Sequence, residues 1–126
     1  MTQTDAALVS AWRDLVDRHA RAITALERAL NDEHKLGVSE YEVLERLASP
    51  DKDQHRVQEL ADGVHLSQSA LSRVVARLEA DGLVTRAICA EDRRGIDVCI
   101  TGEGRERYEA ARPTHRRVLG EVLTGE

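Results

Sequence analysis

The sequence has no long apolar run and almost no cysteine. In its 126 residues no stretch approaches the roughly 20 apolar residues that cross a bilayer. The first residues, from Met1 to Asp5, lack the basic flank and apolar segment of a secretory signal. The only cysteines, Cys89 and Cys99, are too few for a disulfide framework and lack metal-binding spacing. These absences favour a cytoplasmic protein without a membrane segment.

The sequence also lacks the constellations that carry enzyme chemistry. Its five histidines are scattered, without a second histidine or an acidic partner at metal-ligand spacing. Gly102 and Gly104 do not follow a strand–helix–strand pattern, so they predict no phosphate-binding loop. We therefore expect no enzyme activity, no metal and no cofactor. The excess of arginine over lysine is typical of a GC-rich bacterial genome.

A positive net charge is missing as well. The formal net charge is −5, whereas nucleic-acid binders usually show a basic footprint. The sign of one face matters more than that of the whole chain. Residues 55–95 hold six arginines against six acidic residues, so this segment is neutral while the remainder is acidic. Phosphate affinity should therefore be modest and strongly salt-dependent.

Apolar periodicity predicts a mainly α-helical chain. An apolar stripe repeats every three or four residues over about 6–33 and predicts one long helix (Leu8, Trp12, Leu15, His19, Ile23, Leu26, Leu30). A small domain cannot cover such a helix, of about 40 Å, so part of the stripe should meet a second subunit. Ser39 and Glu42 predict a capping box for the next helix. Pro50, with Asp51 and Asp53, predicts a loop.

The segment from His55 to Gly82 predicts two helices joined by a tight turn. The first covers about 56–63, and Ser67 caps the second, over 68–81, which Gly82 ends. Only three residues separate them, as in a helix-turn-helix. Apolar side chains fill the space between these helices (Leu60, Ala61, Val64, Leu66, Leu71, Val74, Leu78). The outward face of the second helix then carries Gln68, Ser69, Ser72, Arg73 and Arg77, which suits a major groove. For an isolated helix the alternative is a solvated face.

A hairpin and a last helix complete the chain. Leu83 to Ile88 and Ile96 to Thr101 predict two strands, with Arg93 and Arg94 at the tip between them. Such a tip can enter a narrow minor groove, although Arg94 can instead pair with Asp92. With Ile88 opposite Ile96, Cys89 and Cys99 are offset, so no disulfide and no thiol sensor is expected. Thr101 caps a helix over about 102–123, which contains Pro113, where a kink is expected.

The stretch from Leu66 to Val84, with the later Asp92–Thr101, resembles the MarR family of multiple-antibiotic-resistance regulators. The resemblance covers essentially the whole chain and implies a homodimeric winged helix-turn-helix repressor that binds a pseudo-palindromic operator on double-stranded DNA. It implies DNA contacts by Ser67, Gln68, Ser69, Ser72, Arg73, Arg77, Arg93 and Arg94. His65 stands where such turns often have glycine, and histidine tolerates the left-handed conformation.

The resemblance also implies one domain over residues 1–126, with dimerisation helices at about 6–33 and 102–123 and a DNA-binding lobe at about 39–101. Family members usually add a further C-terminal helix; since the sequence ends at Glu126, the dimer is expected to rest on the first and last helices alone. The family's small-molecule effector binds between these helices and the lobe. Candidate residues for that site are Trp12, His19, His34, Tyr41, Tyr108 and His115, with simple packing as the alternative for each. The alternative function is a winged-helix protein-interaction module without significant DNA affinity.

Overall fold

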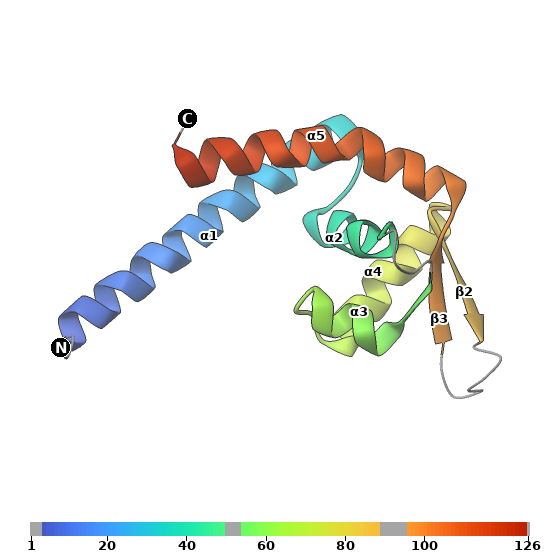
Figure 1. Cartoon of the computed structure of the whole chain (residues 1–126), viewed down its shortest axis with the longest axis horizontal. Coiled ribbons are helices and arrows are strands. Elements are labelled where there is room, and N and C mark those ends of the chain that lie inside the picture. The colour runs from blue at the N-terminus through green and yellow to red at the C-terminus, as the bar shows by residue number, and fades with distance from the viewer. Residues whose placement is uncertain (1–3, 50–53, 89–95, 126) are drawn as a thin grey trace.

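A long N-terminal helix extends well beyond the rest of the molecule. The computed structural model describes residues 4–49, 54–88 and 96–125 (Figure 1). Helix α1 (Asp5–His34) begins where the Thr4 hydroxyl accepts the Ala7 N–H. Every side chain from Asp5 to Arg21 is exposed, and the buried part of its apolar stripe starts only at Ala22. The predicted helix is thus confirmed, and no side chain of its N-terminal half is buried by the described residues.

Helix α2 (Val38–Leu47) begins differently from the prediction. The predicted capping box of Ser39 and Glu42 is wrong, because Ser39 already lies inside the helix. Instead Gly37 is the N-cap residue, and the buried Glu40 carboxylate accepts its N–H at 2.8 Å. Glu27 of α1 accepts the next backbone N–H, that of Val38. Two carboxylates therefore accept the N–H groups of Gly37 and Val38 at this helix end.

The helix-turn-helix forms as predicted. Helix α3 (Val57–Gly63) and helix α4 (Gln68–Ala80) are separated by a turn in which His65 has a φ of 58°. The Ser67 hydroxyl accepts the Ala70 N–H at 3.1 Å, and Gly82 has a φ of 77°. One core position differs: Val75 is buried, whereas the predicted Val74 is only partly covered. Both valines follow Leu71 at helical spacing, and the direction of the neighbouring helices selects Val75.

The sheet has one strand more than the predicted hairpin. Strands β2 (Val84–Ile88) and β3 (Ile96–Ile100) pair antiparallel with Ile88 opposite Ile96, as predicted. Strand β1 (Gln54–Arg56) pairs with the other edge of β3 and gives the order β1-β3-β2. The prediction started the α3 helix at Arg56, and this residue is in fact its N-cap. The predicted loop at Pro50, Asp51 and Asp53 lies outside the described residues.

Helix α5 (Gly102–Thr124) returns from the sheet and lies alongside α1 (Figure 1). The Thr101 hydroxyl caps it by accepting the Gly104 N–H at 3.0 Å, as predicted, and the helix continues through Pro113. One apolar core runs from the C-terminal half of α1 through α2, α3 and α4 to β2, β3 and α5. Within the described ranges, no helix is long and apolar enough to cross a membrane.

Candidate nucleic-acid interface and adjoining cavity

One face of α4 is polar and fully accessible. Leu71, Val75 and Leu78 bury the opposite face against the core. All six predicted contact residues on and before this helix are exposed: Ser67, Gln68, Ser69, Ser72, Arg73 and Arg77. The Ser67 oxygen serves the helix cap, so it can offer a ligand only its hydroxyl hydrogen and a remaining lone pair. The arrangement brings the predicted reading residues together on one surface.

The positive charge of this face is uncompensated. In the part of the chain that the structure describes, neither Arg73 nor Arg77 has an ion-pair partner. The acidic Glu79, on the same helix, lies 3.5 Å from Arg86 of β2. The Arg86 guanidinium also donates to the Ser72 carbonyl at 3.4 Å. Arg86 of β2 thus pairs with Glu79. Arg73 and Arg77 of α4 remain available to bind phosphates or base edges.

Sequence reasoning missed this role of Arg86. It placed Arg86 in a strand, and the alternation of that strand does indicate that the side chain faces away from the core. The sequence pattern does not show that the Arg86 side chain reaches α4, where it contacts Glu79 and Ser72. Thr101 strengthens the same junction, because its hydroxyl donates to the Gly82 carbonyl at 2.8 Å just beyond the end of α4. The base of the hairpin is therefore fixed to the reading helix. Its predicted tip residues, Arg93 and Arg94, lie outside the described residues.

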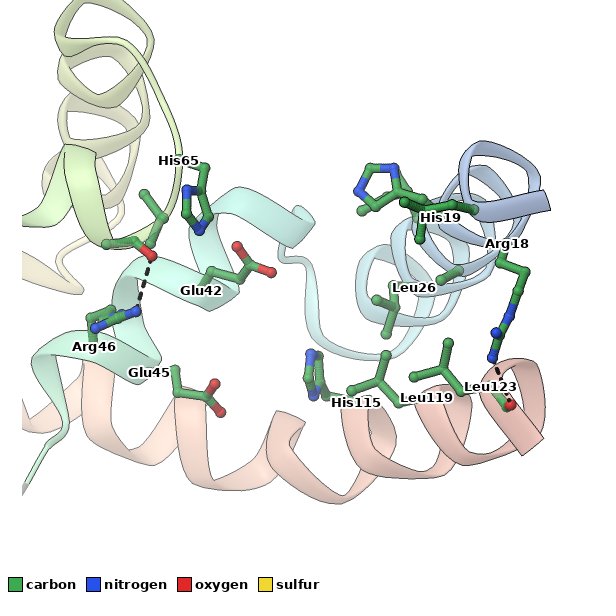
Figure 2. Close-up of a pocket in the computed structure, with 15 residues that line it drawn as sticks. Arg18, His19, Leu26, Glu42, Glu45, Arg46, His65, His115, Leu119 and Leu123 are labelled. Atoms are coloured by element: carbon green, nitrogen blue, oxygen red, sulfur yellow. Dashed lines mark hydrogen bonds between the residues drawn. The ribbon is translucent and has the colours of Figure 1, made fainter. Parts of the chain in front are cut away.

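A cavity of about 610 Å³ lies between the long helices and the helix-turn-helix. Residues of α1, α2 and α5 and of the turn after α3 line it: Leu15, Arg18, His19, Ala22, Ile23, Leu26, Glu42, Glu45, Arg46, Gly63, Val64, His65, His115, Leu119 and Leu123. Figure 2 shows Glu42 and His115 projecting into the space between α1, α2 and α5. One wall is apolar, and the α2 wall carries carboxylates.

The six effector candidates predicted from the sequence lie in different surroundings. His19 and His115 line the cavity. Tyr41 is fully buried behind it and stacks on His115 at 4.3 Å between ring centroids, with Tyr108 at 5.7 Å from Tyr41. Trp12 is 64% exposed on the uncovered half of α1 and does not line the cavity. His34, a further candidate, instead bonds Thr114 of α5. Glu42, Glu45 and His65 also line the cavity. They were not predicted as effector residues, because only the tertiary arrangement brings them together.

A hydrogen-bond network supports the cavity floor. Glu45 accepts from the Tyr41 hydroxyl at 2.9 Å and from Arg116 at 2.8 Å. Burial raises the pKa of the Glu45 carboxyl, but these two hydrogen bonds outweigh it and hold the pKa below its usual range. Burial, and then the Arg116 charge, lower the pKa of His115. Glu45 is therefore a paired carboxylate and His115 is a neutral imidazole at pH 7.

Glu42 differs from its neighbour. No described residue forms a hydrogen bond or ion pair with its carboxylate. Burial raises its pKa, and the nearby Glu45 charge raises it further, against smaller opposing effects of His65, Arg46 and His19. An ionised Glu42 therefore lies in the cavity without a hydrogen bond or ion pair to a described residue, and nearby positive charges offset only part of the cost of its burial.

Known proteins resemble this chain in sequence and in structure. The model of the MarR family matches residues 36–96. The structure of AbsC, a MarR family transcriptional regulator from Streptomyces coelicolor, is 29% identical with a TM-score of 0.86, covering 99% of this chain and 83% of that one. Sco3205, another such regulator from that organism, in complex with DNA, is 29% identical with a TM-score of 0.87, covering 100% and 79%.

A third relative carries a ligand. CouR from Rhodococcus jostii RHA1, bound to p-coumaroyl-CoA, is 26% identical with a TM-score of 0.76, covering 89% of this chain and 77% of that one. The family model spans α2, the helix-turn-helix and β2 and ends at Ile96, the first residue of β3. The structural likeness extends over the long helices. Residues 36–96 therefore match the MarR family, and the whole chain is similar in structure to MarR family transcriptional regulators.

Proposed function

We propose that this protein is a cytoplasmic transcriptional repressor that binds a pseudo-palindromic operator as a homodimer and releases it when a small molecule binds. Helix α4 enters the major groove, with Gln68 and Arg73 toward base edges and Arg77 toward phosphates. Ser67, Ser69 and Ser72 complete the groove contacts, and Arg93 and Arg94 of the wing reach the flanking minor grooves. The observation that carries this proposal is the exposed, uncompensated arginine pair on α4.

The overall acidity of the chain is compatible with this proposal. The net charge is −5, but Arg86 draws the nearest acid of α4, Glu79, away from the reading face. A local cationic surface on an acidic molecule steers DNA to one side and repels it elsewhere. Non-specific binding should then be weak, and the regulator should depend on base contacts for much of its affinity.

The uncovered half of α1 supports the homodimer. Its large apolar side chains are between 42% and 64% exposed (Leu8, Val9, Trp12, Leu15, Val16), and Leu123 at the end of α5 is 48% exposed. Figure 1 shows this half of α1 projecting away from the lobe. A contiguous apolar surface of this kind marks an interaction site. A second copy of the chain is the proposed partner, because two α4 helices then read two half-sites.

The cavity supports the proposed effector. It joins α1 and α5, which belong to the proposed dimer, to α2 and to the turn before α4. A molecule bound there would contact both parts at once and could change the spacing of the two reading helices. CouR, which is similar in structure to this chain, is bound to p-coumaroyl-CoA.

Selection of fragments from the source genome on the purified protein, followed by titration of the recovered site, tests the DNA proposal. We expect Arg73→Ala to weaken binding by about tenfold or more and to relax the preference at one base pair of each half-site, because a bidentate base contact is lost. Arg112→Ala is the matched control, since Arg112 is an exposed arginine on α5, and it should bind as wild type. Equal affinity of Arg73→Ala and wild type would remove Arg73 from the reading face. No DNA binding even at low salt would overturn the repressor in favour of a protein-interaction module.

A further inference from the structure

Some charged side chains of the cavity form hydrogen bonds within the protein, and one does not. Arg18 donates to the Leu123 carbonyl at 3.2 Å, and Arg46 donates to the Gly63 carbonyl at 3.0 Å. Both arginines are exposed, and Figure 2 shows their bonds at opposite ends of the cavity. Glu42 is half-buried between them and has no hydrogen bond to any described residue. The unused charge inside the cavity is therefore negative, and the positive charges are anchored at its rim.

His115 adds a second unused group. Its side chain lines the cavity although the residue is only 6% exposed. Nδ1 faces the Arg116 guanidinium, which can only donate, so Nδ1 is the acceptor and the proton of the neutral ring is on Nε2. Within residues 4–49, 54–88 and 96–125, Nε2 has no hydrogen-bonding partner. This N–H is thus left for a molecule inside the cavity that His115 lines.

The remaining wall requires an apolar body. Ala22, Ile23 and Leu26 of α1, together with Leu119 and Leu123 of α5, supply the apolar part of the lining. From these three features, and on the basis that the cavity is the effector site proposed above, we infer that the effector is a small organic amine. Its protonated amino group binds Glu42, its apolar body lies against these side chains of α1 and α5, and an acceptor oxygen takes the His115 Nε2–H.

An organic anion fits the same cavity less well. Its charge would lie beside Glu42 and Glu45, and like charges in a partly buried site repel. The arginines of the lining, Arg18 and Arg46, lie at the exposed rim, where solvent and salt screen their charge. An ammonium group instead places a positive charge beside Glu42. This charge stabilises the ionised carboxylate and opposes the effects of burial and of the Glu45 charge.

Three matched probes test this inference by thermal unfolding of the full chain in the absence of DNA. Tyramine carries an ammonium group, an aromatic ring and a phenol oxygen. para-Ethylphenol lacks the charge, and para-hydroxyphenylacetate carries the opposite charge. We expect tyramine to raise Tm by a few degrees in a saturable way, since a ligand that binds only the folded state stabilises it. The neutral probe should act more weakly, and the anion should be the weakest.

The variant Glu42→Gln identifies the group responsible. It keeps the shape of the side chain and removes the charge, so we expect it to weaken tyramine binding by about tenfold and to abolish the preference for tyramine over para-ethylphenol. Glu109→Gln, at an exposed position of α5 outside the cavity, should behave as wild type. Far-UV circular dichroism checks that Glu42→Gln is folded, and unchanged binding of the unliganded variant to the selected operator fragment checks that its reading face is intact.

A larger Tm rise with para-hydroxyphenylacetate than with tyramine would overturn the inference, as would a tyramine preference that survives in Glu42→Gln, or no shift with any probe. These outcomes are separate from failure of the repressor proposal, because Tm is measured without DNA. A protein that binds tyramine through Glu42 but never binds DNA would retain the cavity ligand and lose the proposed function. A protein that binds its operator but ignores tyramine would do the reverse.

Discussion

At the scale of single residues, Gly104 has the tightest steric requirement among the described glycines with close neighbours. A Cβ at this position would lie 2.1 Å from the Leu83 carbonyl oxygen and 2.8 Å from the Ile100 side chain. Thr101 holds the two segments together, because its N–H donates to the same Leu83 carbonyl at 3.0 Å. The close approach lets α5 leave the sheet directly and return toward α1. A side chain here can be accommodated only by moving backbone.

We therefore expect Gly104→Ala to lower the free energy of unfolding by about 3 kcal/mol, at the upper end for overpacked sites. Gly120→Ala is the matched control on the same helix, where a Cβ meets nothing within 4 Å. It should stabilise the protein by up to about 1 kcal/mol, because alanine is the better helix former. Urea titration followed by circular dichroism measures both. Equal stability of Gly104→Ala and Gly120→Ala would contradict the close approach.

Residue-scale predictions from the sequence succeeded where a residue's own chemistry decides the conformation. Ser67 and Thr101 cap their helices, and Gly82 and His65 adopt positive φ. Each depends on neighbours a few positions away in the chain. The predicted cap of α2 was wrong. Ser39 was the better candidate by its own side chain, but Gly37 is the N-cap residue and its N–H is accepted by the buried Glu40 carboxylate. Packing against α1, which the local pattern does not contain, fixes that choice.

At the scale of elements, α2 and α5 are joined by stacked rings. Tyr41 of α2 lies parallel to within 22° of His115 of α5, and the Glu45–Arg116 ion pair lies beside them. This contact connects the lobe that carries α4 to a helix of the proposed dimer. Burial and the Arg116 charge both oppose protonation of His115, against the Glu45 charge, so its pKa in the folded protein lies below 6.5.

This shift predicts an acid-sensitive contact. The unfolded chain takes up a proton at His115 near its ordinary pKa, and the folded chain resists it. Stability from His115 is therefore present above pH 6.5 and is lost as the pH falls through the lower pKa of the folded state. We expect Tm to fall by a few degrees more between neutral and mildly acidic pH in wild type than in His115→Gln. Differential scanning calorimetry over that range provides the comparison. Parallel pH profiles of the two proteins would show that His115 does not carry the effect.

The sequence predicted the elements with long periodic patterns and missed the short one. Both long helices, the helix-turn-helix and the β2–β3 register were available from apolar spacing and turn chemistry. Strand β1 has three residues and becomes a strand only because the free edge of β3 pairs with it. The cavity was inaccessible for a related reason: its lining comes from four separate segments between Leu15 and Leu123, and no local pattern fixes how they meet.

At the scale of the whole molecule, the two halves of α1 differ in how far their apolar side chains are exposed to solvent. The C-terminal half of α1 is enclosed by α5 and the lobe, whereas the other half exposes a row of apolar side chains at helical spacing. Burying that row would add stability of about 25 cal/mol for each Å² of apolar surface. A second copy of the chain that covers it would also hold two α4 helices at a fixed separation. Operator half-sites one helical turn apart, about 34 Å, require such a separation.

Trp12 lies at the centre of that row and is 64% exposed, so replacing it should change assembly without disturbing the core. We expect Trp12→Asp to convert the dimer to a monomer in light scattering, because the substitution places a charge in an apolar interface. Thr24→Asp adds the same charge at an exposed position on another side of α1 and should remain dimeric.

We expect Trp12→Asp to affect binding to the full operator and binding to an isolated half-site differently. A single head loses the effective-concentration advantage of the pair, so the affinity of Trp12→Asp for the full operator should fall by about 10²- to 10⁴-fold. Its affinity for an isolated half-site should stay at the wild-type value, because the α4 face is unchanged. A monomeric variant that keeps full operator affinity would mean that each head binds independently. In that case the exposed face of α1 would serve assembly alone, and the pseudo-palindromic operator would lose its physical basis.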